Sequence, residues 1–226
     1  MKRVLSLMLV ASGALLGASA MPSYAADAAA RPKVDIAKGE ELFTNGDDAR
    51  GIISCASCHG PGGNSSIPIN PILAKQHPEY LIKQLHDFKT GDEGKAAARP
   101  SASMAVMAEP LTEEDIRNIA AYLGKQSIEE PAYAKNPATI EQGQTIYRAG
   151  ITAKGVPACA ACHSPNGAGI PAQYPRLAGQ FPDYTEQQLI EFRSGERQNH
   201  AAMAAIAAKL SDAEIKAVSD YIAGLR

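Results

Sequence analysis

The sequence is organised around CASCH at residues 55–59, which recurs as CAACH at residues 159–163. These two stretches contain all four cysteines of the chain and two of its five histidines. Cys-x-x-Cys-His is the attachment signature of c-type haem, because two thiols one helical turn apart can each bond to a vinyl group on one edge of the porphyrin. The adjacent histidine then supplies a nitrogen ligand to the iron.

The chain is therefore predicted to bind two haem c groups covalently. The predicted cofactor-binding residues are Cys55, Cys58, His59, Cys159, Cys162 and His163. A Cys-x-x-Cys pair has three other interpretations: a thioredoxin-like redox pair, half of a zinc site, or a disulfide. The sequence lacks strand patterns for the βαβ unit of a redox pair, and a zinc site built from both pairs would leave the repeated histidine unexplained.

The first 25 residues have the pattern of a signal peptide. Lys2 and Arg3 precede the apolar run 4–16, which is too short to cross a bilayer comfortably. Cleavage is predicted after Ala25, with Ala20 as a second candidate, and a retained membrane anchor is the alternative. Export to the periplasm agrees with the cysteines, because haem is attached to c-type cytochromes outside the bacterial cytoplasm.

The charge balance restricts the partners. The formal net charge of −2 becomes −4 once Lys2 and Arg3 are removed with the leader. Such a chain is not basic enough for nucleic acid or for an anionic membrane surface. We therefore expect no nucleic-acid partner and at most a loose association with a membrane.

An internal repeat covers most of the chain after the leader. At an offset of 104 residues the two haem motifs coincide, together with pairs of glycine, proline and aromatic residues: Gly39 and Gly143, Phe43 and Tyr147, Pro71 and Pro175, Tyr80 and Tyr184, Phe88 and Phe192. After these pairs the first copy carries five extra residues, and the offset becomes 99. We predict a first domain over residues 26–125, a linker over 126–139 and a second domain over 140–226.

Each copy reads as helices joined by long loops, so the predicted fold class is all-α. In the first copy, helices are expected near 36–45, at the haem motif, from Pro78 onward, and after the capping sequence 112–115. In the second copy, residues 211–214 cap the last helix in the same way. The prolines of the predicted linker indicate an extended segment.

Methionine is the usual sixth ligand of the haem iron in electron carriers, and its sulfur raises the reduction potential. The second copy has one methionine, Met203, whereas the first has Met104 and Met107. The offset of 99 pairs Met104 with Met203, so these two methionines are the predicted sixth ligands of the two irons. Met107 is the alternative ligand in the first copy, and its predicted role is core packing.

Histidine is the other candidate for the sixth position. His77 and His86 are not repeated in the other copy, and His200 lies close to Met203. With methionine preferred, the predicted metal ligands are His59, Met104, His163 and Met203. A carbonyl near Pro71 or Pro175 is expected to accept the Nδ1 proton of each axial histidine.

These residues resemble the dihaem cytochrome c4 family. The second copy is similar at CHSPNG (162–167), YPRLAGQ (174–180) and AAKLS (207–211), and the first at CHGPGGN (58–64). The first copy departs from the family where Lys75 stands in place of the usual glycine. The resemblance implies two tandem class I cytochrome c domains with His–Met haems. It also implies contact between the haem propionates across a pseudo-two-fold interface.

The predicted function is periplasmic transfer of single electrons, without enzymatic turnover. Both copies supply a methionine at matching positions, and no catalytic acid, base or nucleophile is repeated near either motif. The expected donors are a quinol–cytochrome c reductase or a dehydrogenase, the expected acceptor is a terminal oxidase, and the protein is expected to be a monomer. The alternatives are an electron-accepting subunit of a periplasmic dehydrogenase and a dihaem enzyme, such as a peroxidase or a thiosulfate-oxidising cytochrome.

Intact-mass spectrometry of the exported protein should give the processed polypeptide plus two haems. Thioether bonds survive denaturation, so extraction with acid and acetone should leave both haems on the chain. A variant with Cys159→Ala and Cys162→Ala serves as the control and should carry one haem. A mass excess of a single haem on the unmutated chain would contradict the prediction.

Overall fold

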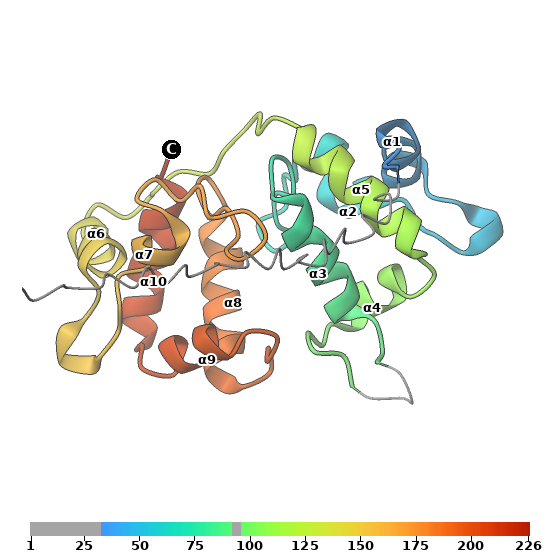
Figure 1. The fold of residues 1–226 in the computed structure, drawn as a ribbon. Helices are drawn as coiled ribbons and strands as arrows, with labels where there is room; N and C mark the ends of the chain where they lie inside the picture. Colours follow the sequence, from blue (N-terminus) through green and yellow to red (C-terminus); the bar gives the residue numbers. More distant parts are fainter. Residues whose placement is uncertain (1–32, 92–95) are drawn as a thin grey trace, which may run out of the picture. The chain divides into compact units, whose positions relative to one another are not determined.

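The computed structural model describes residues 33–91 and 96–226, and the elements are shown in Figure 1. The predicted signal peptide and part of the five-residue insertion lie outside the described residues. Residues Val34–Arg226 form one compact unit. Within the described ranges the regular structure is helical, and β structure is limited to isolated bridges such as Asp47 with Ile52, so the all-α prediction is confirmed.

The helices follow the same order in the two repeats, as the sequence predicted. The first repeat contains α1 (Ile36–Asn45), η1 (Asp48–Arg50), α2 (Ala56–His59), η2 (Pro61–Gly63), α3 (Pro78–Phe88), α4 (Ala102–Ala108) and α5 (Glu113–Lys125). The second contains α6 (Ile140–Ala149), η4 (Thr152–Lys154), α7 (Ala160–His163), α8 (Pro182–Ser194), α9 (Ala201–Ala207) and α10 (Asp212–Ala223). The short helices α4 and α9 are additions to the helices expected from the sequence.

A glycine lets the first and last helices of each repeat cross at close range. A Cβ on Gly39 would lie 2.1 Å from the carbonyl oxygen of Asn118, and a Cβ on Gly143 would lie 2.2 Å from that of Ala217. One turn further along, aromatic rings meet across the same crossing with centroids 5.7 Å apart, in Phe43 with Tyr122 and in Tyr147 with Tyr221. The repeated glycine and aromatic therefore serve one purpose, which is to dock α1 on α5 and α6 on α10.

Each repeat has its own hydrophobic core around this crossing. The buried core of the first consists of Leu42, Phe43, Ile52, Leu81, Leu111, Ile116, Ile119, Ala120, Tyr122 and Leu123. The buried core of the second consists of Ile146, Tyr147, Val156, Ala178, Leu189, Phe192, Ala207, Leu210, Ile215, Val218, Ile222 and Leu225. The duplication seen in the sequence is therefore a duplication of the core.

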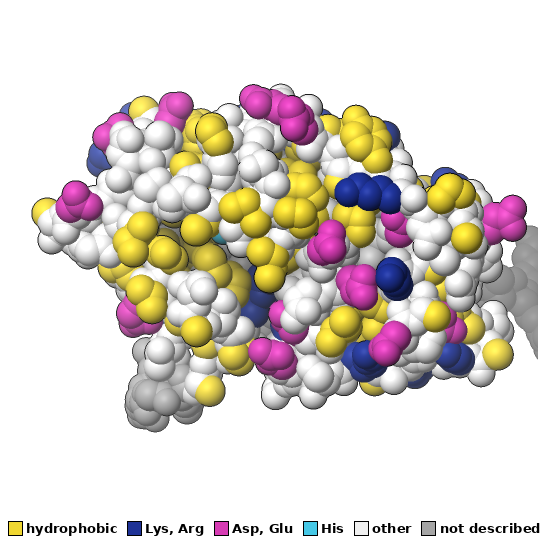
Figure 2. Space-filling view, turned by 180° about the vertical axis from the view of Figure 1, so that it is seen from behind, with side chains coloured by type: hydrophobic (Ala, Val, Ile, Leu, Met, Phe, Trp, Pro, Cys, Tyr) yellow, Lys and Arg dark blue, Asp and Glu magenta, His cyan; other side chains and the backbone are white. Residues whose placement is uncertain are grey.

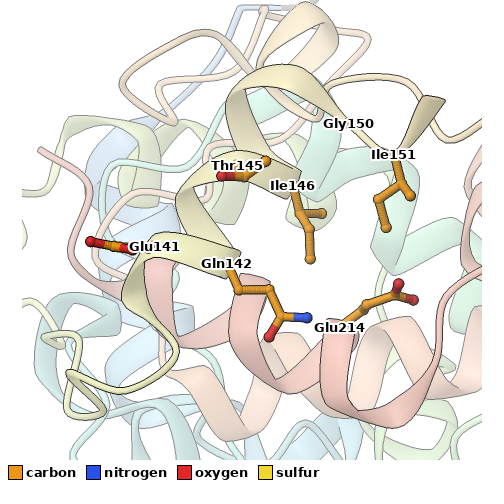
Figure 3. Close-up of a pocket in the computed structure, with 7 residues that line it drawn as sticks. All are labelled: Glu141, Gln142, Thr145, Ile146, Gly150, Ile151 and Glu214. Carbon is orange, nitrogen blue, oxygen red and sulfur yellow. The ribbon is translucent and has the colours of Figure 1, made fainter. Parts of the chain in front are cut away.

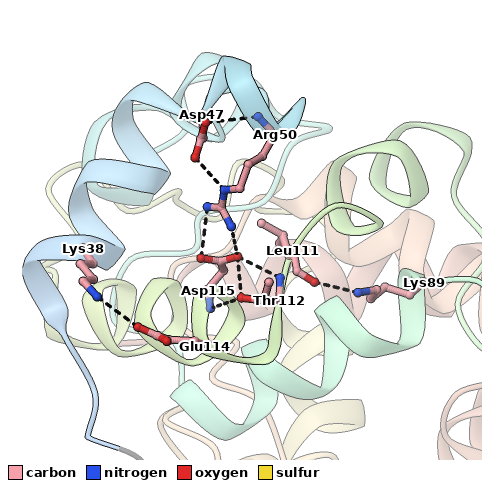
Figure 4. Close-up of polar contacts among 8 residues, drawn as sticks. All are labelled: Lys38, Asp47, Arg50, Lys89, Leu111, Thr112, Glu114 and Asp115. Carbon is pink, nitrogen blue, oxygen red and sulfur yellow. Dashed lines mark hydrogen bonds and ion pairs between the residues drawn. The ribbon is translucent and has the colours of Figure 1, made fainter.

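The predicted capping boxes are present at the starts of α5 and α10. In the first, the Asp115 carboxylate accepts from the Thr112 backbone N–H at 2.9 Å, and the Asp115 N–H donates to Thr112 Oγ1 at 3.2 Å (Figure 4). Arg50 of η1 adds a hydrogen bond to Asp115 at 2.8 Å and one to Asp47 at 2.6 Å. Burial opposes ionisation of Asp115, but these hydrogen bonds prevail and hold its pKa below the usual range.

The two repeats contact each other through reciprocal hydrogen bonds. The Gln76 side chain bonds to the backbone of Arg176, and the Gln180 side chain bonds to the backbone of Ile72. These four residues occupy equivalent positions at the offset of 104 residues. Contacts exchanged in this way are the signature of an isologous interface, and they relate the repeats by a pseudo-two-fold axis.

The difference at Lys75 has a conformational consequence. Lys75 has a φ of +61°, and its counterpart Gly179 has a φ of +74°. The left-handed region disfavours a residue with a Cβ by about 1–2 kcal/mol. At Gly179 a Cβ would also lie 2.8 Å from Cβ of Pro131. The first repeat therefore tolerates a strain that the second avoids.

Replacing Lys75 with glycine should raise the free energy of unfolding by up to about 1 kcal/mol. The relief of left-handed strain exceeds the extra entropy that glycine gives to the unfolded chain. The matched substitution Gly179→Ala should lower the free energy of unfolding, by about 1 kcal/mol or more, because it adds both strain and a clash with Pro131. Denaturant unfolding of the haem-loaded protein measures both changes. A loss of stability in Lys75→Gly would contradict the conformational argument.

Candidate haem-binding sites

Each haem motif forms a single helical turn. In α2 the N–H of His59 donates to the carbonyl of Cys55 at 3.0 Å, and in α7 the N–H of His163 donates to the carbonyl of Cys159 at 2.9 Å. None of the four cysteines is paired in a disulfide in this structure. Burial raises the pKa of Cys55 and of Cys159, each to about 11. The paired thiols are thus set one turn apart, as attachment to two vinyl groups requires.

The two motif histidines are buried and oriented by backbone carbonyls. His59 is 8% exposed, with Nδ1 3.1 Å from the carbonyl oxygen of Pro71. His163 is 7% exposed, with Nδ1 3.1 Å from that of Pro175. This confirms the predicted carbonyl partners. Because a carbonyl only accepts, Nδ1 carries the proton and Nε2 presents a lone pair, which is the tautomer needed for a metal ligand.

Burial lowers the pKa of His59 and of His163, and the carbonyl contacts oppose this only in part. Both imidazoles are therefore held in the neutral form that binds a metal. The ring of His163 also meets that of Tyr174 edge-on, with centroids 5.9 Å apart.

The loops that carry these carbonyls are anchored by glycine. The carbonyl of Gly63 accepts from the N–H groups of Leu73 and Ala74 at 2.8 and 3.1 Å. The carbonyl of Gly167 accepts in the same way from the second loop, at 2.8 and 3.0 Å. Gly63 has a φ of +78°, and a Cβ there would lie 2.9 Å from the backbone nitrogen of Ala74. A glycine is thus needed where the motif segment meets the proline loop.

The candidate methionines lie at equivalent positions of two short helices. Met104 and Met203 are each the third residue of a seven-residue helix, α4 and α9. The N–H of Met104 donates to Oγ of Ser101, and the N–H of Met203 donates to Nδ1 of His200, both at 3.3 Å. Met107 falls on the position of Ile206. The offset of 99 residues therefore holds in three dimensions, as the sequence indicated.

The three other histidines make contacts of their own. His77 Nε2 lies 2.9 Å from the carbonyl oxygen of Ala168, and His86 Nε2 lies 3.3 Å from a carboxylate oxygen of Glu113. His200 caps α9. Each rival ligand thus has a structural role that the sequence did not reveal.

Two arginines are buried between the repeats, and the sequence analysis missed them. Arg99 is 8% exposed and donates to Tyr184 at 2.8 Å, while Arg197 is 5% exposed and donates to Tyr80 at 3.2 Å. Both guanidinium groups also donate to Gln84, at 2.9 and 3.0 Å. Little in the sequence indicates this pair, because the two arginines are 98 residues apart and this separation matches neither repeat offset.

These two arginines provide a test of whether the chain fits haem. Among the described residues, neither guanidinium forms an ion pair with a carboxylate; each instead lies over an aromatic ring, Phe88 at 4.5 Å and Phe192 at 4.4 Å. A buried cation without a counter-charge is costly. Haem carries two propionate anions, so the buried charge, the free thiols and the oriented imidazoles all suit this cofactor.

A hollow of about 370 Å³ lies elsewhere in the second repeat (Figure 3). It is lined by residues of α6, by the turn at Gly150 and Ile151, and by Glu214 of α10. Glu214 forms an ion pair with Lys154, with 2.7 Å between Nζ of Lys154 and Oε2 of Glu214. No cysteine or histidine is among the residues that line this hollow.

The surface carries mixed charges. Figure 2 shows acidic and basic side chains interspersed with apolar ones over one face. Large apolar side chains are exposed beside the first haem motif, at Ile53, Ile67 and Ile69, and on α4 at Val106. In the part of the chain that the structure describes, no helix combines the length and apolar character needed to cross a membrane.

Comparisons with known proteins agree with this geometry. The family model "Cytochrome c" matches residues 36–127 and again residues 140–226. The chain is 44% identical over 201 residues to cytochrome c4 of Thiocapsa roseopersicina, covering 87% of this chain and 96% of that protein. It is also 33% identical over 195 residues to a thiosulfate dehydrogenase electron acceptor of Stutzerimonas stutzeri, covering 84% and 87%.

A solved structure has the same fold as this chain. The crystal structure of reduced recombinant cytochrome c4 from Pseudomonas stutzeri superposes with a TM-score of 0.76 at 38% sequence identity. The match covers 86% of this chain and 100% of that one. The similarity therefore extends over both repeats.

Proposed function

The chain belongs to the cytochrome c family, as a dihaem member of the cytochrome c4 group, and we propose that it carries electrons in the periplasm toward a terminal oxidase. It is an electron-transfer cytochrome with two covalently bound haem c groups. The proposal goes further, to the location, the partners and the residues that hold each haem. We also propose the boundaries 1–25 for the signal peptide, 26–125 and 140–226 for the domains, and 126–139 for the linker.

One observation supports the proposal: each repeat has two cysteines, a buried histidine and a methionine at equivalent positions. The proposed attachment residues are Cys55 and Cys58 for the first haem and Cys159 and Cys162 for the second. The proposed axial pairs are His59 with Met104 and His163 with Met203. A repeat with both axial groups supplied by the chain leaves no open position for a substrate, which favours a carrier over an enzyme.

When bound, the haem supplies an iron that accepts and releases one electron. The chain's residues set the conditions for this chemistry. The carbonyl oxygens of Pro71 and Pro175 lie 3.1 Å from Nδ1 of the two histidines, accept the Nδ1 protons and increase the basicity of the rings. Arg99 and Arg197 place two positive charges at the interface, where they would balance haem propionates.

The proposed donors are a quinol–cytochrome c reductase or a dehydrogenase, and the proposed acceptor is a terminal oxidase. We propose that the protein works as a monomer and associates with the membrane at most loosely. The mixed surface charges (Figure 2) support short-lived docking, because such encounters have a polar rim.

A second candidate is an electron-accepting subunit for a periplasmic dehydrogenase. The relative named as a thiosulfate dehydrogenase electron acceptor favours it, at 33% identity over most of both chains. The two candidates share the same haem chemistry and differ only in the donor and acceptor.

The deciding experiment adds the reduced protein to membranes stripped of periplasmic proteins. Oxygen uptake and oxidation of the protein should rise together, saturate with protein concentration, and stop with cyanide. A protein with Cys55→Ala and Cys58→Ala is the control for the first haem. Failure of oxidation by membranes, combined with rapid reduction by a purified dehydrogenase, would replace the main proposal with the second. Saturable reduction of peroxide by the protein alone would overturn both.

The Met104 assignment predicts a specific spectral change. Oxidised His–Met haems show a weak absorption band near the red end of the spectrum that reports the iron–sulfur bond. Met104→Ala should remove about half of this band, since one of two iron–sulfur bonds is lost. Met107→Ala is the matched control and should leave the band intact. Loss of the band in Met107→Ala would show that the other methionine of α4 is the ligand.

A further inference from the structure

We propose that Gln76 and Gln180 form a reciprocal clasp, by which each repeat positions the axial histidine of the other repeat. The proposal rests on the ligand roles of His59 and His163 proposed above. In this arrangement the glutamine of the second repeat acts on the first haem, and the glutamine of the first repeat acts on the second haem.

The first half of the clasp grips a single residue with two hydrogen bonds. Oε1 of Gln180 accepts from the N–H of Ile72 at 3.0 Å, and Nε2 of Gln180 donates to the carbonyl of Ile72 at 2.9 Å. The second half repeats this arrangement about the pseudo-two-fold axis. Oε1 of Gln76 accepts from the N–H of Arg176 at 2.9 Å, and Nε2 of Gln76 donates to the carbonyl of Arg176 at 2.9 Å.

In each half of the clasp, the hydrogen bond accepted by the glutamine Oε1 comes from the peptide group that already contacts a histidine. The N–H of Ile72 belongs to the same peptide unit as the carbonyl of Pro71, which lies 3.1 Å from Nδ1 of His59. A continuous chain of hydrogen bonds therefore runs from His59, through that peptide unit, to Gln180. A peptide whose N–H donates becomes a better acceptor at its carbonyl, because the two dipoles polarise each other.

The second chain of hydrogen bonds has the same construction. The carbonyl of Pro175 lies 3.1 Å from Nδ1 of His163, and the N–H of the same peptide unit, at Arg176, donates to Gln76. Both chains cross from one repeat to the other. The connection is thus between each histidine and the opposite repeat.

The clasp is rigid and shielded from water. Gln76 and Gln180 are each 8% exposed. Their Oε1 atoms also accept from the next backbone N–H, of His77 and of Phe181, both at 3.0 Å, at the starts of α3 and α8. Each glutamine amide is therefore held by hydrogen bonds to both repeats, and buried hydrogen bonds are stronger than exposed ones. The two glutamines therefore act as positioning residues, not as haem ligands.

The electronic consequence has a definite sign. A stronger acceptor at Nδ1–H makes the imidazole a better electron donor to iron, and this favours the oxidised state. Removing Gln180 should therefore raise the reduction potential of the first haem. Removing Gln76 should raise that of the second.

The test compares Gln180→Met with Gln76→Met in the full haem-loaded protein. Methionine keeps the size of the side chain and removes its hydrogen bonds. The readout is the equilibrium partition of one electron between the two haems, resolved by the haem methyl signals in the NMR spectrum of the half-reduced protein. We expect a change of about threefold or more, toward the first haem in Gln180→Met and toward the second in Gln76→Met.

The control is His77→Phe, which copies the second repeat, where Phe181 stands at this position. It removes the contact between the repeats at Ala168 without altering either peptide unit of the clasp. The electron partition should stay as in the unmutated protein. A shift of the partition in the same direction in both glutamine variants, or no shift, would overturn the proposal.

Two further measurements keep the outcomes separate. The near-red band of each variant reports whether methionine ligation survives, so absence of that band in the unmutated protein would refute the proposed haem ligation and not the clasp. If a glutamine variant does not fold, amide hydrogen exchange in the unmutated protein tests whether the hydrogen bonds of the clasp are present. The N–H groups of Ile72 and Arg176 should exchange slowly although they lie outside helices, and fast exchange of either would refute the clasp.

Discussion

The site depends on one hydrogen bond, made twice. It joins each motif histidine to a carbonyl twelve residues later, at Pro71 and at Pro175. This contact ties the single helical turn of the cysteines to the following loop, and it fixes which nitrogen of the ring remains available for iron. The glycine carbonyls at Gly63 and Gly167 hold the loop from one side, and the opposite repeat holds it from the other.

The duplication produces two sites that share their backbone conformation and differ in individual side chains. Lys75 and Gly179 adopt the same left-handed backbone, but only the lysine is strained by it. Ser101 and His200 cap the equivalent methionine helices with different groups. The two repeats therefore give equivalent sites unlike surroundings. Reduction potential responds to hydrogen bonding and charge near the iron, which makes this inequality useful in a two-centre carrier.

The contact between the repeats includes a buried polar cluster. Its centre holds Arg99 and Arg197 with glutamine and tyrosine partners, and these guanidinium groups have no carboxylate partner among the described residues. A protein without its cofactor would have to bury two positive charges without compensation. Anionic groups such as haem propionates would supply that compensation if they lay at this interface.

The sequence by itself determined the cofactor, the repeat and the main helices. Three patterns can be recognised without knowledge of the fold: the two haem motifs, the offset of 104 residues and the capping sequence at Thr112. The glycine and aromatic of α1 were recognised as repeated, but their purpose emerged only where α1 crosses α5. The methionine register also came from the sequence, through the change of offset to 99, and the equivalent positions in α4 and α9 agree with it.

The tertiary structure alone decided what joins the repeats. Gln76 and Gln180 lie in matching positions of the sequence, yet nothing local indicates that each bonds to the backbone of the other copy, about 100 residues away. Arg99 and Arg197 do not share an offset, so the repeat could not pair them. Contacts across a pseudo-two-fold axis depend on how two finished domains dock, and that information is not carried by hydrophobic periodicity or by motif spacing.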